Sequence, residues 1–238
     1  MTSKLHSVPA LRCARLLLAG AALVSAVGCA TGPDANPQDP LEPFNRGVYR
    51  VNDALDTAVL KPVATAYQSV APSPVQTGVN NFFGNLGDLW SAANAALQLR
   101  PREAGENLMR FSVNSVLGLA GVLDIATEAG IPRTRTDFGQ TLGRWGAPAG
   151  PYLVLPILGP SSVRDGTGVL VDLSVDPVSN MNDVSARNSL TALRVVDTRA
   201  GLLRATTLLE EAALDPYSFT RDLYLNRRQG QIDDMLDQ

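Results

Sequence analysis

PVQTGVNNFFGNLGDLWSAANAALQL, residues 74–99, is the stretch that decides the fold. Its apolar residues recur at alternating steps of three and four, which places them on one face of an α-helix. They are Val75, Val79, Phe82, Leu86, Leu89, Ala93 and Leu97. Pro101 closes the segment, because proline cannot continue a helix. The stretch therefore predicts one long amphipathic helix.

Helical spacing also dominates the sequence on both sides of this stretch. It predicts further helices over residues 43–58, 102–117, 190–207 and 217–235. The best strand signal is Tyr152–Leu155, but Pro151 and Pro156 bracket it. We therefore expect an extended segment there rather than a sheet strand. The sequence predicts an all-α fold, with a single domain over residues 41–238.

The N-terminus has the three parts of a secretory signal peptide. Basic residues come first, at Lys4, Arg12 and Arg15. An apolar run, LLLAGAALVSAVG, fills residues 16–28 and leads into Cys29. The ending AVGC resembles a bacterial lipobox, so we expect residues 1–28 to be removed and Cys29 to become the lipidated N-terminus. The alternatives are an ordinary signal peptide with a stray cysteine, or an anchor helix. The apolar run is short of the roughly 20 residues that a spanning helix needs.

Residues 29–40 are rich in proline, aspartate, asparagine and glycine, a composition that cannot build a core. We expect them to form a lipidated tether between the anchor and the domain. Residue 30 is alanine rather than the aspartate that resembles an inner-membrane retention signal. We therefore expect the outer membrane, on its periplasmic face, as the location.

The composition of the mature chain excludes several classes of function. Cleavage would remove three of the 20 basic residues and none of the 23 acidic ones, which leaves a net charge of −6 and argues against a nucleic-acid partner. It would also remove His6 and Cys13, the only histidine and the only other cysteine. Serine–histidine or cysteine–histidine catalysis and histidine or cysteine zinc sites are then excluded. We expect no catalytic residue, no metal and no cofactor. One lysine, Lys61, remains beside many arginines.

Glycine and proline recur every few residues from Gly139 to Gly168, with short apolar runs between them. This pattern suits re-entrant or interfacial structure at a membrane. A buried core with irregular connections is the alternative. We expect Gly143, Gly146 and Gly150 to allow close backbone approach or a positive φ.

A polar stripe follows one face of the expected helix over 102–117. It consists of Glu103, Asn107, Arg110 and Asn114. It is either a solvated helix face or a track for a lipid headgroup between apolar walls. Asn107, Arg110 and Asn114, together with Arg144 and Arg164, are the candidate headgroup residues, because guanidinium pairs with phosphate. The alternative for each arginine is a structural ion pair with Asp124, Asp137 or Asp165.

Four stretches of the sequence resemble the MlaA/VacJ family of outer-membrane lipoproteins. They are DPLEPFNRGVYRVND (39–53), NNFFGNLGD (80–88), RFSVNSVLGLAGVLD (110–124) and DFGQTLGRWGAPAGPYLVLPILGPSSVRD (137–165). The resemblance covers roughly residues 39–225, and its motifs are long and in the family's order.

The resemblance implies a helical, ring-like body that lies in the periplasmic leaflet of the outer membrane, with an amphipathic channel. It implies that mislocalised phospholipid leaves the outer leaflet through this channel and passes to a soluble periplasmic lipid carrier. It also implies association with trimeric porins. The alternative is a structural, porin-associated lipoprotein without a lipid path. A lipid hydrolase is a third hypothesis, but the mature chain has no histidine to activate a nucleophile.

Overall fold

Helices make up most of the computed structural model, which describes residues 36–236. In chain order the elements are α2 (Glu42–Leu55), the π-helical turn η1 (Asp56–Leu60), α3 (Lys61–Val70), α4 (Ser73–Leu97), α5 (Pro101–Val116), α6 (Ile125–Glu128), α7 (Phe138–Arg144), β1 (Tyr152–Leu155), β2 (Gly159–Ser162), α8 (Val163–Val175), α9 (Val184–Ala212) and α10 (Pro216–Leu236). Every helix expected from the sequence is present, which confirms the prediction of a predominantly helical fold. Within the described residues, no helix combines the length and the apolar character needed to cross a membrane. Cys29 lies outside the described residues.

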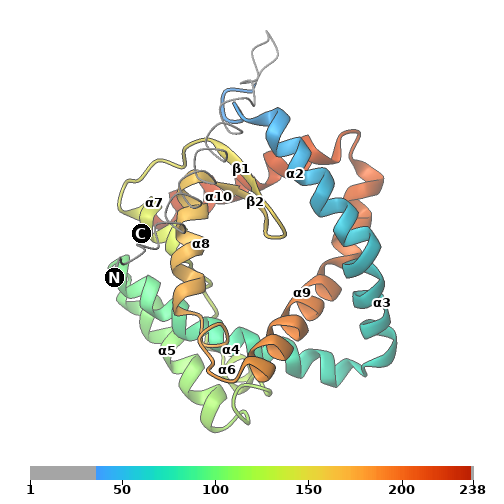
Figure 1. Cartoon of the computed structure of the whole chain (residues 1–238). Coiled ribbons are helices and arrows are strands. Elements are labelled where there is room, and N and C mark those ends of the chain that lie inside the picture. The colour runs from blue at the N-terminus through green and yellow to red at the C-terminus, as the bar shows by residue number, and fades with distance from the viewer. Residues whose placement is uncertain (1–35, 237–238) are drawn as a thin grey trace, which may run out of the picture.

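The elements follow one another around a ring (Figure 1). α2 runs through η1 into α3, α3 packs against α9, and α9 packs against α4. α4 contacts α7, α7 packs against α8 and α10, and both of these helices contact the β-strands. β1 contacts α2 and so closes the ring, while α5 packs along α4. The ring-like arrangement implied by the family resemblance is confirmed.

The π-helical turn η1 lies where the chain curves from α2 into α3 (Figure 1). Pro62, in the first turn of α3, lacks the N–H that would continue the hydrogen-bond ladder. Such a missing bond is a common cause of helix bending. Asp56 in the turn accepts two hydrogen bonds from Arg199 of α9, at 2.6 and 2.7 Å. This ion pair fixes the curved segment against the neighbouring helix α9.

Side-chain caps set where three helices of the ring begin. Asp137 accepts a hydrogen bond from the backbone N–H of Gln140 at the start of α7, at 2.9 Å. Ser162 caps α8 in the same way, and Asp183 caps α9. Each cap satisfies a backbone donor that has no partner within the helix.

The segment Tyr152–Leu155 is a sheet strand, so the expectation of an unpaired extended segment is wrong. It pairs antiparallel with β2, with Tyr152 opposite Ser162 and Leu155 opposite Gly159. Pro151 and Pro156 flank the strand and do not interrupt it, so no ladder donor is lost within it. On the other edge, Asn45 of α2 accepts a hydrogen bond from the N–H of Val154 at 2.9 Å and donates one to the carbonyl of Tyr152 at 3.0 Å.

A cluster of buried hydrophobic residues forms where this hairpin packs against α10. Its buried members are Tyr152, Val154 and Tyr217. The end of the expected tether packs beside them: Gln38 accepts a hydrogen bond from the N–H of Tyr152, and Asp39 is fully buried. The Asp39 carboxylate accepts hydrogen bonds from Asn45, Tyr217 and Arg221. A buried carboxylate requires such partners. These contacts hold residues 38 and 39 in the folded domain, although the sequence predicted them as part of the tether.

Candidate functional site

Several polar side chains of helix α5 are buried, whereas several of its apolar side chains are exposed. Asn107, Arg110 and Asn114 are at most 1% exposed, whereas Val116 is 79% exposed. Leu108, Met109 and Leu117 are exposed as well. The polar stripe is therefore not a solvated helix face, because the turns that follow α5 cover it.

Helix α4 is arranged in the same way. Its buried residues are polar or small, and they are Gly78, Asn85, Asp88, Ser91, Ala92, Asn94 and Ala95. Three residues of its predicted apolar face are exposed: Val75, Leu89 and Leu97. Asn85 donates a hydrogen bond to the hydroxyl of Ser115 on α5, at 2.9 Å. The contact between these two helices thus includes a hydrogen bond between polar side chains.

Arg110 lies at the centre of the buried polar cluster. Its Nη2 donates to both carboxylate oxygens of Asp124, at 2.7 and 2.8 Å, and to Thr127 at 3.0 Å. Its Nε lies 3.5 Å from a carboxylate oxygen of Asp88, which also pairs with Arg133 at 2.9 Å. The side chain thus has the structural ion pair with Asp124 that was the alternative to a headgroup contact.

The two carboxylates of this cluster have opposite pKa shifts. Burial raises the pKa of Asp88 above its ordinary value, and the charges of Arg133 and Arg110 offset this only in part. Burial also opposes ionisation of Asp124, but hydrogen bonds from Thr127 and Asn114 outweigh it and lower its pKa to about 2. Asp124 is therefore the firmly ionised partner of Arg110.

The two asparagines of the stripe hold the same segment. Asn107 donates to the carbonyl of Thr134 at 2.8 Å. Asn114 donates to Asp124 at 3.0 Å and accepts from the N–H of Ala126 at 2.8 Å. The stripe fastens residues 124–134 to α5, and in this structure all three candidate residues contact protein and not open space.

The two other candidate arginines lie in different surroundings. Arg164 is buried and pairs with Asp165 at 2.9 Å, which is again the ion-pair alternative. Asp165 also accepts hydrogen bonds from Tyr224 at 2.6 Å and from Arg228 at 2.9 Å. Arg228 forms a second, two-bond pair with Asp137, at 2.6 and 2.7 Å. These contacts join α7, α8 and α10. Arg144 lies apart from them, at the edge of a cleft.

The three candidate glycines occupy tight or unusual backbone positions. A Cβ on Gly143 would lie 2.5 Å from the side chain of Ile232 on α10, so α7 and α10 approach closely there. Gly146 has a φ of +90° in open space, and Gly150 has a φ of +68° beside Val163. Both values lie in the region that favours glycine.

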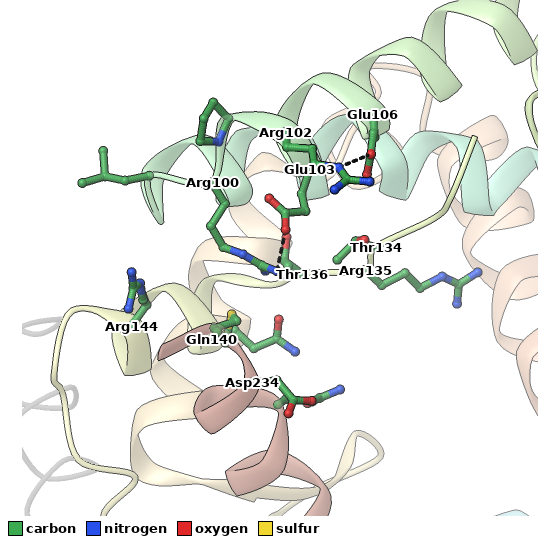
Figure 2. Close-up of a pocket in the computed structure, with 14 residues that line it drawn as sticks. Arg100, Arg102, Glu103, Glu106, Thr134, Arg135, Thr136, Gln140, Arg144 and Asp234 are labelled. Atoms are coloured by element: carbon green, nitrogen blue, oxygen red, sulfur yellow. Dashed lines mark hydrogen bonds and ion pairs between the residues drawn. The ribbon is translucent and has the colours of Figure 1, made fainter. Parts of the chain in front are cut away.

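The described residues enclose a polar cleft of about 750 Å³ between α5, α7, α10 and residues 134–136 (Figure 2). Arg100 pairs with Glu103 at 2.8 Å, and Arg102 pairs with Glu106 at 2.9 Å. The full lining is Leu99, Arg100, Pro101, Arg102, Glu103, Glu106, Thr134, Arg135, Thr136, Gln140, Arg144, Gln231, Asp234 and Met235. The cleft offers hydrogen-bond donors and charges of both signs.

A second pocket, of about 400 Å³, is apolar and lies between α4, α9 and the turn after α5. Phe82, Phe83 and Leu193 are among its lining residues. Sequence reasoning identified neither pocket. It also missed Asp88, Arg133 and Arg228, although it named Asp124, Asp137 and Asp165 as possible partners of arginines.

Comparison with known proteins finds relatives of one family. The profile of the MlaA lipoprotein family matches residues 37–231. The intermembrane phospholipid transport system lipoprotein MlaA of Shigella flexneri is 37% identical over 207 residues, which cover 84% of this chain and 82% of that protein. The protein of the same name from Haemophilus influenzae is 33% identical and covers 90% of this chain and 89% of its own length.

A solved structure has the same fold. It comes from work on the structural basis for maintenance of bacterial outer membrane lipid asymmetry. It superposes with a TM-score of 0.71 at 33% identity, and the match covers 82% of this chain and 98% of the solved one. With a profile that spans most of the chain and relatives above 30% identity over most of their length, this chain belongs to the MlaA lipoprotein family.

Proposed function

We propose that this protein is an outer-membrane lipoprotein that removes mislocalised phospholipid from the outer leaflet and passes it to a soluble periplasmic carrier. Relatives in Shigella flexneri and Haemophilus influenzae are named as phospholipid transport lipoproteins. The structure that superposes on this chain comes from work on outer-membrane lipid asymmetry. The relatives support a role in phospholipid transport, and the exposed apolar residues of α4 and α5 support a location in the membrane.

The observation that carries the proposal is the outward-facing apolar surface of α5. In water, each Å² of exposed apolar surface costs about 25 cal/mol. Large exposed apolar patches on a protein mark membrane or protein contacts. Leu108, Met109 and Val116 are exposed on this helix, and Leu117 is exposed at its C-terminal end, whereas Asn107, Arg110 and Asn114 are buried. Surrounding hydrocarbon removes the cost of that exposure, so we place this face in the acyl region of the periplasmic leaflet.

We place the lipid path, an amphipathic channel, through the middle of the ring. A phospholipid crosses a bilayer slowly because its charged headgroup must enter hydrocarbon, where an unpaired charge is very costly. A protein path with polar groups on one side lowers that cost. The ring of elements supports this proposal, because it closes around a single axis (Figure 1). Its members, in order of contact, are α2, α3, α9, α4, α7, α8 and β1.

The proposal includes the anchor and the partners. Acyl chains on Cys29 would hold the ring at the membrane, because stable anchoring takes more than one chain. Trimeric porins would contact the apolar exterior of the ring, and a soluble carrier would receive lipid on the periplasmic side. We propose no catalytic step, because the mature chain lacks histidine and a free thiol.

Deletion of the gene tests the proposed function. We expect phospholipid to rise in the outer leaflet and the cells to become sensitive to detergent and to chelators. Re-expression of the wild-type chain restores both properties, and Cys29→Ser restores neither, because the chain that cannot be acylated is left uncleaved or mislocalised and does not reach the outer membrane. Unchanged surface phospholipid in the deletion strain contradicts the proposal.

Co-purification separates transport from a scaffold role. Phospholipid bound in stoichiometric amount to the detergent-extracted protein supports a lipid path. A lipid-free preparation supports the structural, porin-associated alternative. Release of lyso-lipid by the purified protein would instead support a hydrolase.

A further inference from the structure

Two charged side chains at the centre of the buried cluster each have one polar atom that no hydrogen bond satisfies. Asp88 accepts both hydrogen bonds from Arg133 on Oδ2, at 2.9 and 3.2 Å, and its Oδ1 has no donor in the part of the chain that the structure describes. Arg110 donates from both terminal nitrogens, but its Nε makes no hydrogen bond within the same residues. Both side chains are 1% exposed. Buried polar atoms are almost always bonded, so these two indicate a partner other than a side chain.

The two unsatisfied atoms lie close to each other. Nε of Arg110 is 3.5 Å from Oδ2 of Asp88, and Oδ1 belongs to the same carboxylate. A molecule that bonds to both atoms spans up to about 6 Å, because each hydrogen bond is about 3 Å long.

Asn107 supplies a further acceptor. It lies one turn before Arg110 on the same face of α5 and is fully buried. Its Nδ2 donates to the carbonyl of Thr134, which fixes the orientation of the carboxamide, and its Oδ1 has no partner among the described residues. The site between α4 and α5 thus offers one donor and two acceptors.

The charges around the site decide which ligand fits. Asp88 and Asp124 carry two negative charges, and Arg110 and Arg133 carry two positive charges, so the cluster is already neutral. A metal cation would leave a net positive charge in a buried place beside the guanidinium of Arg110, which is very costly. An anion would be repelled by the carboxylate of Asp88. A small neutral molecule that both donates and accepts hydrogen bonds meets neither penalty.

The polar cleft provides a route by which water reaches this place. Thr134 lines the cleft, where Figure 2 shows it beside α5, and its carbonyl accepts the hydrogen bond from Asn107. Glu103 of α5 lines the cleft as well and lies one turn before Asn107. The cleft therefore borders the site at Asn107.

We propose that α4 and α5 hold an internal water molecule that accepts a hydrogen bond from Nε of Arg110 and donates to Oδ1 of Asp88 and to Oδ1 of Asn107. Three hydrogen bonds are the usual number for a buried water. The water joins the two helices where Arg110 and Asp88 are too far apart for a good direct hydrogen bond. Bound solvent is then a structural part of the ring wall, because a bridging water holds two groups nearly as well as a direct bond.

Proton NMR of the full mature protein in detergent, with isotope-labelled arginine, tests the site. We expect Nε–H of Arg110 to show a dipolar cross-peak to water, with the sign that marks a long-lived bound molecule. Nε of Arg199 is the internal control, since it donates directly to Asp56 at 2.6 Å and should show no such cross-peak. Arg110→Lys assigns the signal by removing it. Absence of a cross-peak at Arg110, or one that arises only from exchange with bulk water, would overturn the assignment.

A crystal structure of the same protein tests the site without a variant. We expect ordered density within about 3 Å of both Oδ1 of Asp88 and Nε of Arg110. Crystals soaked in rubidium chloride separate water from a monovalent cation, because rubidium scatters anomalously and water does not. We expect no anomalous peak at the site. An anomalous peak would show a cation site and a gap without density would show a dry cluster, and either result refutes the internal water.

Discussion

Replacing Arg110 with methionine removes the central cation of the buried cluster and keeps a side chain of similar length. In the wild-type protein, Arg110 is 1% exposed and donates two hydrogen bonds to Asp124 and one to Thr127. The substitution leaves Asp124 without its guanidinium and removes a positive charge from beside Asp88. Arg133 remains, 2.9 Å from Asp88 and 3.8 Å from Asp124, so one arginine is left for two carboxylates that shared two in the wild-type protein.

The expected loss follows from that geometry. Breaking a buried pair by removing one partner costs about 3–5 kcal/mol of unfolding free energy. For a chain of this size, each kcal/mol shifts Tm by roughly 2–4 °C. Arg110→Met should therefore lower Tm by about 6–20 °C. Arg102→Met is the matched control, because Arg102 lies on the same helix and its pair with Glu106 is exposed. Exposed pairs contribute about 0–1 kcal/mol, so the control should change Tm little.

Thermal unfolding of the detergent-extracted protein, followed by circular dichroism, measures both variants under one condition. If Arg110 acts mainly on a passing headgroup, its substitution reduces transport while Tm stays within a few degrees of wild type. That outcome would refute the structural role inferred from the pair with Asp124. A large fall in Tm for Arg110→Met alone supports it.

Three further predictions follow from other parts of the fold. Gly146→Val should destabilise the protein by roughly 1–2 kcal/mol in thermal unfolding, because the φ of +90° is unfavourable for a β-branched residue; Gly146→Asn should cost less, and equal stability of all three chains would contradict the backbone argument. Asp124 has a pKa of about 2 in the fold, below its ordinary value, so its contribution of about 2 kcal/mol is present above about pH 4 and is lost as the pH falls through 2. Asp124→Asn should flatten the dependence of unfolding free energy on pH between about pH 2 and 4, and an unchanged dependence would count against the lowered pKa of Asp124. A chain that begins at residue 36, without acyl chains, should still bind phosphatidylethanolamine vesicles through its exposed apolar residues, and a monomer that ignores vesicles in a flotation assay would show that this surface does not bind membranes.

The helices were predictable because periodicity is a local property of the chain. The predicted helix over 74–99 corresponds to α4, which ends at Leu97, just before the turn that leads to Pro101. The direction in which its faces point was not predictable in the same way. Periodicity separates Val75 and Leu89 from Asn85 and Asp88, but it does not say which set is buried. In a soluble protein the apolar set would be buried, and here the polar set is.

The hairpin and the cleft depend on contacts between distant residues. Tyr152–Leu155 is a strand because it pairs with β2, and Asn45, over one hundred residues earlier, binds its other edge. The cleft combines residues near 100, near 135 and near 234, and no local pattern brings these together. Arg144 was named from the sequence, whereas Arg135 and Gln140 of the same cleft were not.

The polar interior and the apolar exterior explain the unusual choice of basic residues. When hydrocarbon surrounds a helix, apolar side chains gain little by packing against one another, and polar contacts and close packing hold the elements together. Such contacts must neutralise carboxylates without water, which favours the planar fork of arginine over the strongly hydrated ammonium of lysine. Arginine forms two-bond pairs through two of its nitrogens, and examples are Arg199–Asp56, Arg194–Asp176 and Arg228–Asp137. Lys61 pairs only at the exposed surface, with Glu210. With the ring placed in the membrane as proposed, the presence of Lys61 as the only lysine in residues 36–236 follows from how the ring is held together.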